Sequence, residues 1–161
     1  MLKVIKAMGI NAGVRQSLDK EDVERIVRLL ETFVDAAHEI KEESALFPLV
    51  MDRAAGNVRE KLQAQVFEHN QERSLIEGMR EAMMTSNSED FAYDATRLAE
   101  FLAEHVRKAY LLFKEFEILL QPENDRRIVS DFEKLDADLR PKLEDVSAII
   151  ENLERKYRRA A

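Results

Sequence analysis

Apolar residues recur along this chain at alternating spacings of three and four, which places them on one face of an α-helix. Four stretches show this spacing: residues 19–51, 58–85, 91–119 and 125–157. Charged and polar residues occupy the opposite faces, and no stretch alternates with the period of two that a half-buried strand requires. The pattern therefore predicts an all-α protein.

Short runs of turn-forming residues separate the four stretches. Gly56 and Asn57 end the first, with Asn57 as a candidate N-cap, and Ser86 with Glu89 predicts a capping box before the third. Long amphipathic helices joined by short turns favour an up-down-up-down four-helix bundle. We expect residues 17–161 to form one such bundle, with 125–157 as its C-terminal helix.

The two ends of the chain are less regular. Residues 1–16 carry a few apolar positions that could form a short helix, which Gly9 and Gly13 are expected to end. We expect this segment to pack on the bundle. Near the other end, Pro141 falls at the height of the histidines, with Asp138, Glu144 and Asp145 around it. Proline there is expected to bend the last helix or divide it in two.

Composition narrows the range of functions. The chain has 161 residues and a net charge of -7, which disfavours nucleic acid and anionic membranes as partners. No apolar run approaches the roughly 20 residues of a membrane span. There is no cysteine, so disulfides and thiolate metal sites are excluded. Without cysteine or a signal sequence, we expect a cytoplasmic protein.

The three histidines of the chain fall at one height of the predicted bundle. His38 lies 16 residues before a turn near residue 54, and His69 lies 15 residues after it. His69 and His105 are each 18 residues from the turn near residue 87. At about 1.5 Å of rise per residue, all three agree in height to within one helical turn. All three also lie on or beside the inward stripes, so we expect them to converge.

Carboxylates accompany two of the histidines. His38 and Glu42 are four residues apart, and His69 and Glu72 are three apart, so each pair projects from one face of a helix. A carboxylate in an apolar stripe is costly unless it is paired or binds a cation. Nitrogen and oxygen ligands without sulfur suit Fe, Mn or Zn. The candidate metal ligands are His38, Glu42, His69, His105 and Glu72.

Each of these residues also has a purely structural interpretation. The histidines can be three independent core residues, each hydrogen-bonded to its own partner. Glu42 can pair with Lys41 or Arg73, and Glu72 can lie on a solvated flank of its helix.

The stretch His38–Pro48, with Lys-Glu-Glu and then Leu-Phe-Pro after the histidine, resembles the first motif of the hemerythrin-like, or HHE cation-binding, family. The Glu68–His69 pair is similar to the Glu-His pair on the family's next helix. His105 with Val106 and Lys108 resembles the last motif. The resemblance covers roughly residues 18–120.

The resemblance implies a four-helix bundle around a non-haem, often di-iron, centre held by histidines and two bridging carboxylates. It implies His38 as a terminal ligand, Glu42 as a bridging carboxylate, and His69 and His105 as ligands from the next two helices. The roles it implies are oxygen binding, iron or oxygen sensing, and NO or peroxide handling.

The sequence departs from the family pattern in its ligand set. No histidine precedes His38, Ala109 and Tyr110 stand where a carboxylate follows the last histidine, and Arg73 stands where a second histidine sometimes follows His69. We therefore expect iron as a mononuclear or partial di-iron centre, with Zn or Mn as alternatives, rather than a complete pair.

Three functional hypotheses follow. The first is a metal-binding module that senses or binds iron, O2 or NO. The second is a degenerate bundle that binds no metal and acts as a scaffold or regulatory partner. The third is an oxidase or peroxidase, for which the sequence offers no catalytic residue beyond the metal ligands. Self-association into a homo-oligomer is compatible with all three.

Overall fold

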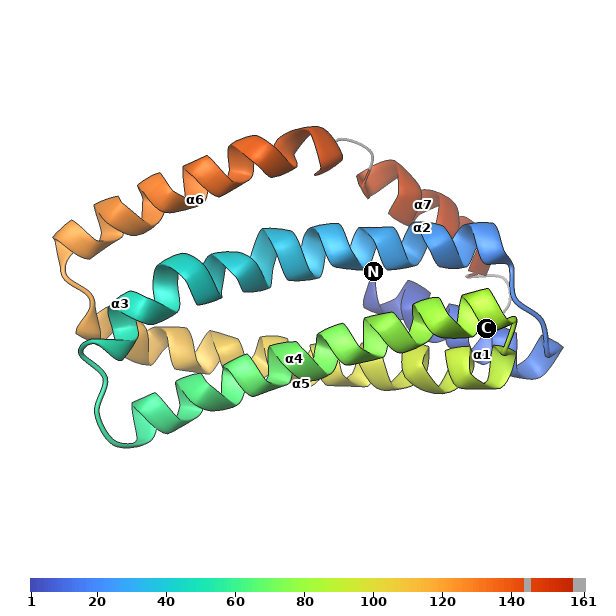
Figure 1. The fold of residues 1–161 in the computed structure, drawn as a ribbon, viewed down its shortest axis with the longest axis horizontal. Helices are drawn as coiled ribbons and strands as arrows, with labels where there is room; N and C mark the ends of the chain where they lie inside the picture. The colour runs from blue at the N-terminus through green and yellow to red at the C-terminus, as the bar shows by residue number, and fades with distance from the viewer. Residues whose placement is uncertain (144–145, 158–161) are drawn as a thin grey trace.

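The computed structural model is a bundle of long helices that lie side by side, as the sequence predicts (Figure 1). It describes residues 1–143 and 146–157, and there is no strand among them. The elements are α1 (Leu2–Arg15), α2 (Lys20–Leu30), the π-helical stretches η1 (Glu31–Glu39) and η2 (Glu42–Leu46), α3 (Phe47–Met51), α4 (Asn57–Thr85), α5 (Ser88–Leu119), α6 (Pro122–Leu143) and α7 (Val146–Tyr157).

The elements α2, η1, η2 and α3 follow one another as one long helix. The Asp19 side chain caps its start by accepting a hydrogen bond from the Asp22 backbone N–H. Pro48 lies at the start of α3, inside this long helix, and the helix continues past it to Met51. In η1 the Ile40 N–H donates to the Asp35 carbonyl, five residues back. Such π-helical turns often lie at functional sites.

The turns between the long helices differ in detail from the prediction. Gly56, with φ of 55°, precedes α4, so Asn57 is the first helical residue and not the cap. Ser86 ends α4 in the left-handed conformation, and Asn87 caps α5 by accepting from two backbone N–H groups. The predicted Ser86–Glu89 capping box is therefore wrong by one residue, because Ser86 adopts the left-handed conformation that ends α4 and Asn87 becomes the N-cap.

The N-terminal segment forms a helix despite its two glycines. Gly9 and Gly13 both lie inside α1, which packs mostly along α5. A Cβ on Gly9 would meet Thr96 Oγ1 at 3.0 Å and the Ala92 carbonyl oxygen at 3.2 Å. The expected helix break is wrong because the missing side chain at Gly9 permits close helix packing, which outweighs glycine's weak helix propensity.

Replacing Gly9 by alanine should destabilise the protein by about 1–3 kcal/mol through overpacking against α5. Gly13 is the matched control on the same helix, since its Cβ would meet only the Ala92 Cβ, at 3.4 Å. Gly13→Ala should therefore be neutral or stabilise the protein by up to about 1 kcal/mol. Urea unfolding of both variants measures the difference, and equal effects at the two positions would contradict the close approach at Gly9.

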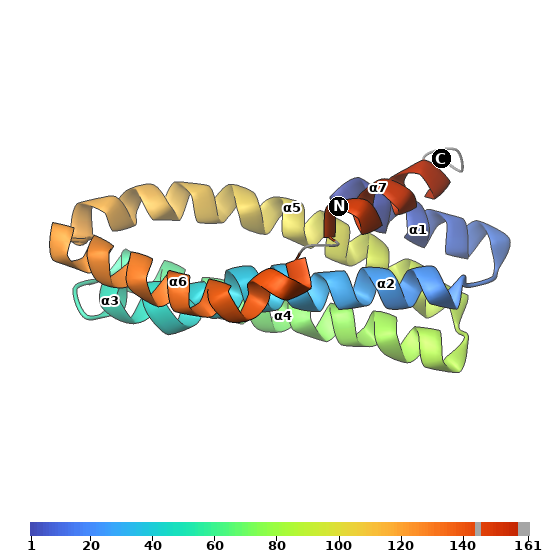
Figure 2. The same ribbon diagram turned by 90° about the horizontal axis from the view of Figure 1, so that it is seen from above.

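The predicted C-terminal helix is two helices. α6 runs alongside η1 and η2, and α7 packs on α1 and α2 (Figure 2). The Tyr157 hydroxyl donates to Asp22 Oδ2 at 2.9 Å, which joins the end of α7 to the start of α2. The side chains of Asp138, Pro141, Glu144 and Asp145 lie outside the described part of the chain. In that part, no helix is both long enough and apolar enough to cross a membrane.

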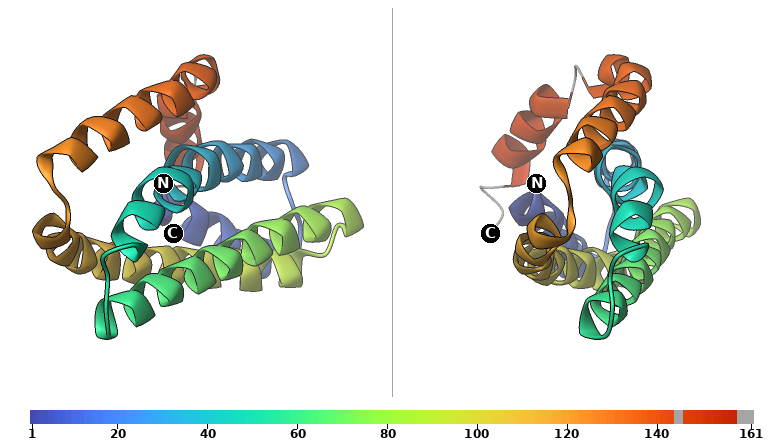
Figure 3. Two further views of the ribbon diagram at one scale, coloured as in Figure 1. Left: turned by 60° about the vertical axis from the view of Figure 1, so that its left-hand side comes forward. Right: turned by 90° about the vertical axis from the view of Figure 1, so that its left-hand side faces the viewer.

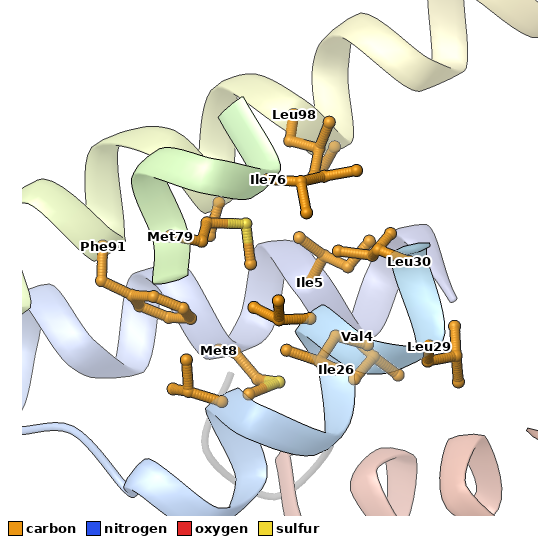
Figure 4. Close-up of a cluster of buried hydrophobic side chains, with 14 of the residues drawn as sticks. Val4, Ile5, Met8, Ile26, Leu29, Leu30, Ile76, Met79, Phe91 and Leu98 are labelled. Carbon is orange, nitrogen blue, oxygen red and sulfur yellow. The ribbon is translucent and has the colours of Figure 1, made fainter. Parts of the chain in front are cut away.

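The core consists of two hydrophobic clusters separated by a polar layer. The larger cluster joins α1, α2, α7, the end of α4 and the start of α5 (Figure 4). The smaller one joins α3, the start of α4 and the end of α5, which lie at the same end of the bundle (Figure 3). Between them lie the buried polar residues of the long helix, α4 and α5: Glu39, Glu42, Gln65, His69, Glu72 and His105. The candidate site occupies this layer.

Candidate metal centre

The three histidine rings converge in the polar layer, as the helix counting predicts. The ring centroids of His69 and His105 are 5.0 Å apart, and those of His38 and His105 are 6.2 Å apart. His69 and His105 are buried, whereas 41 % of the His38 side chain is exposed. Three helical elements, η1, α4 and α5, therefore each supply one imidazole to a single centre.

The two buried histidines are held in the same way. His69 Nδ1 lies 2.7 Å from Glu43 Oε1, and His105 Nδ1 lies 3.2 Å from Glu68 Oε2. The Nε2 atoms of both are buried, and neither has a hydrogen-bond partner among the described residues. A carboxylate on one ring nitrogen orients a histidine whose other nitrogen binds a metal. These buried Nε2 atoms are therefore the ones through which the two rings could bind a cation.

Glu42 lies between two of the histidines. Its Oε1 is 3.3 Å from His38 Nε2 and its Oε2 is 3.5 Å from His69 Nε2. The side chain is 5 % exposed, and in the described part of the chain Oε2 accepts no hydrogen bond. Glu42 is therefore placed to share a cation with the imidazoles.

Two further acids, Glu39 and Glu72, are buried beside these candidate ligands. Glu39 and Glu72 are both fully buried, and the two Glu72 oxygens have no hydrogen-bond partner among the residues described. Burial raises the pKa of Glu39. Burial, with the Glu39 carboxyl beside it, raises the pKa of Glu72 to about 9. Without a cation, the pair therefore retains a proton at neutral pH.

The pKa values of the two buried histidines are shifted in opposite directions. Burial and the neighbouring His69 lower the pKa of His105, which keeps it neutral. Burial acts in the same sense on His69, but the Glu42 and Glu43 carboxylates outweigh it and raise the pKa. A cation would replace the proton that these carboxylates attract, since neutral imidazole is the metal-binding form.

Two groups of side chains bring their ligand atoms within 4.8 Å of one another: His38, Glu42 and His105, and Glu39, Glu43 and His69. Four of the five residues expected from the sequence fall in these groups. Glu72 lies beside them, with its Oε1 3.3 Å from His105 Nδ1.

Sequence reasoning did not single out Glu39, Glu43 or Glu68 as contributors to this site. Their adjacency to His38, Glu42 and His69 in the chain was the available signal. The described residues also do not show the purely structural roles that the sequence left open for Glu42 and Glu72. Glu72 is buried rather than solvated, and Lys41 pairs with Asp136 of α6.

An all-helical bundle with a buried cluster of histidines and carboxylates defines a class of cation-binding protein. The family model of the hemerythrin HHE cation binding domain matches residues 5–115, from α1 through most of α5. This chain belongs to that family. No curated protein and no solved structure matches it. The matched range begins before the residues that carry the sequence resemblance, so α1 belongs to the family domain, while α6 and α7 follow it.

Proposed function

We propose that this protein binds a metal ion, iron by preference, through His38, Glu42, His69 and His105. The observation that carries the proposal is the pair of buried Nε2 atoms on His69 and His105, each unmatched within the described chain while Nδ1 is held by a carboxylate. Several imidazoles with a carboxylate and no sulfur suit non-haem iron, with Mn or Zn as alternatives. Glu72, close to His105, is proposed to support the centre.

The proposed centre reaches the surface at His38. His69, His105 and Glu42 are buried, but 41 % of the His38 side chain is exposed although α6 lies nearby. We propose that a small molecule such as O2 or NO reaches the metal past His38. A bound iron would supply redox chemistry and a free coordination position, and the protein's part is to orient the imidazoles. A cytoplasmic location and self-association stay predictions.

Metal analysis of protein purified without a histidine tag tests the proposal. We expect about one iron per chain after growth with added iron, and loss of that iron in His105→Asn. Glu104→Gln is the matched control, because it alters the exposed residue next to His105 and should leave the metal content unchanged. Iron-loaded protein exposed to NO should also change its visible absorption spectrum.

Failure to bind Fe²⁺, Mn²⁺ or Zn²⁺ in a calorimetric titration, with the protein folded by circular dichroism, would contradict the proposal. The same holds if His105→Asn retains its iron. The scaffold hypothesis would then be preferred, with the polar layer serving only to hold the bundle together.

A further inference from the structure

The positively charged side chain of Arg73 lies against the second group of candidate metal ligands, Glu39, Glu43 and His69. The Arg73 guanidinium, from α4, reaches the face of the long helix that carries Asp35, Glu39 and Glu43. Its Nε donates to Asp35 Oδ1 at 2.8 Å, and its Nη2 donates to Glu43 Oε1 at 2.9 Å. The same Nη2 lies 3.0 Å from Glu39 Oε2. One guanidinium therefore contacts three carboxylates.

Two of those carboxylates are the ones that a metal would need. Glu39 and Glu43, with His69, form the second group whose ligand atoms lie within 4.8 Å of one another. Arginine stays protonated in proteins, so its charge is permanent. A divalent ion between Glu39 and Glu43 would meet this positive charge and compete for the oxygens that it contacts.

Arg73 also acts on one of the four proposed metal ligands, His69, through a shared oxygen. Glu43 Oε1 accepts from Arg73 Nη2 and lies 2.7 Å from His69 Nδ1. A carboxylate held by the guanidinium keeps the proton of His69 on Nδ1, which directs the lone pair of Nε2 toward Glu42. The side chain that lies against the carboxylates of the second group thus orients His69, one of the four proposed metal ligands.

We propose that the Arg73 guanidinium takes the place of a second metal ion, so that the chain holds a single divalent cation at His38, Glu42, His69 and His105. This inference rests on the proposed function and specifies its stoichiometry. The negative charge of Glu39 and Glu43, which a second metal ion would otherwise balance, is balanced by the Arg73 guanidinium. The centre is therefore a one-metal site with a permanent internal cation beside it.

Titration of the metal-free protein with Mn²⁺ and Zn²⁺, read by calorimetry and elemental analysis, tests the inference. The wild type and Arg73→Lys, which keeps the charge, should bind one equivalent. Arg73→His, which removes the permanent charge and adds an imidazole, should bind two. Arg80→His is the matched control, because it adds a histidine to α4 where the arginine pairs with Glu31 and Glu77, and it should bind one.

Two equivalents on the wild type would overturn the inference whether or not any variant folds. One equivalent on both the wild type and a folded Arg73→His protein would overturn it as well. If the wild type binds none and Arg73→His binds one, the proposed function fails while the role of Arg73 stands. If neither binds metal, both fail.

Discussion

Removal of the bound metal by a chelator should lower the midpoint of thermal unfolding by roughly 8 to 16 °C. An ion present at 1,000 times its dissociation constant stabilises the folded state by about 4 kcal/mol. In a domain of this size each kcal/mol moves the midpoint by about 2–4 °C. The effect is large because the metal-free site buries the Glu72 oxygens and the Nε2 atoms of His69 and His105 without hydrogen-bond partners in the described chain.

Scanning calorimetry of the loaded, stripped and reloaded protein measures this shift. Reloading should restore the midpoint, because the ligands belong to folded helices. Stripped and loaded forms with the same midpoint would contradict a cation that neutralises the buried layer, since such an ion must favour the folded state.

The stripped protein should also lose stability as the pH rises. The pKa of Glu72 is about 9 in the folded chain against an ordinary value of 4.5, so the folded state holds more protons between these values. The stability that this proton provides is therefore complete below about 4.5 and is lost as the pH rises toward 9. Glu72→Gln should flatten this slope and stabilise the stripped protein at pH 8 by on the order of 2 kcal/mol.

Glu81→Gln serves as the control for Glu72→Gln. Glu81 lies on the same helix but is exposed, so its substitution should leave both the slope and the stability nearly unchanged. Equal pH slopes for the wild type and Glu72→Gln would show that Glu72 does not hold the buried proton.

Phe91→Ala should destabilise the protein by about 3–5 kcal/mol, independently of metal. Phe91 is 1 % exposed and lies in the larger cluster, among Met8 of α1 and Met79 of α4 (Figure 4). Truncation would leave a cavity where α1, α4 and α5 meet, and close-packed helices collapse only partly into such a space.

Tyr93→Ala is the matched control, because Tyr93 is an aromatic residue on the same helix that is 61 % exposed. Its substitution should change the free energy of unfolding by no more than about 0.5 kcal/mol. The losses in unfolding free energy of the two variants, measured by denaturant unfolding, should therefore differ several-fold. Similar losses would show that the larger cluster is not the main source of stability.

Helix periodicity predicted more of the site than family motifs alone. His38, His69 and His105 were placed at one height by counting residues from the turns, and their rings do converge. Counting succeeds because the rise per residue is constant along a helix. Predictions from local residue preferences failed at Gly9, where close packing on α5 decides the structure, and at Ser86, which ends α4 while Asn87 caps α5.

The same counting could not find the acids around Arg73. In an uninterrupted α-helix, positions 35 and 43 are about 12 Å apart along the axis and about 80° apart around it, so one side chain would not be expected to contact both. The π-helical stretches η1 and η2 change the rotation between them. Hydrogen bonds from Arg73 then join residues 30 and 38 positions away in the chain.

The sequence by itself determined the helical bundle, the height of the three histidines and the resemblance that the family match confirms, because these depend on local spacing and on the order of residues. Only the tertiary structure decided which atoms meet: that Glu43 and Glu68 hold the Nδ1 atoms, and that Arg73 occupies the second group of ligands. Those contacts join different helices, and their geometry depends on helix packing and on turns that no local pattern specifies.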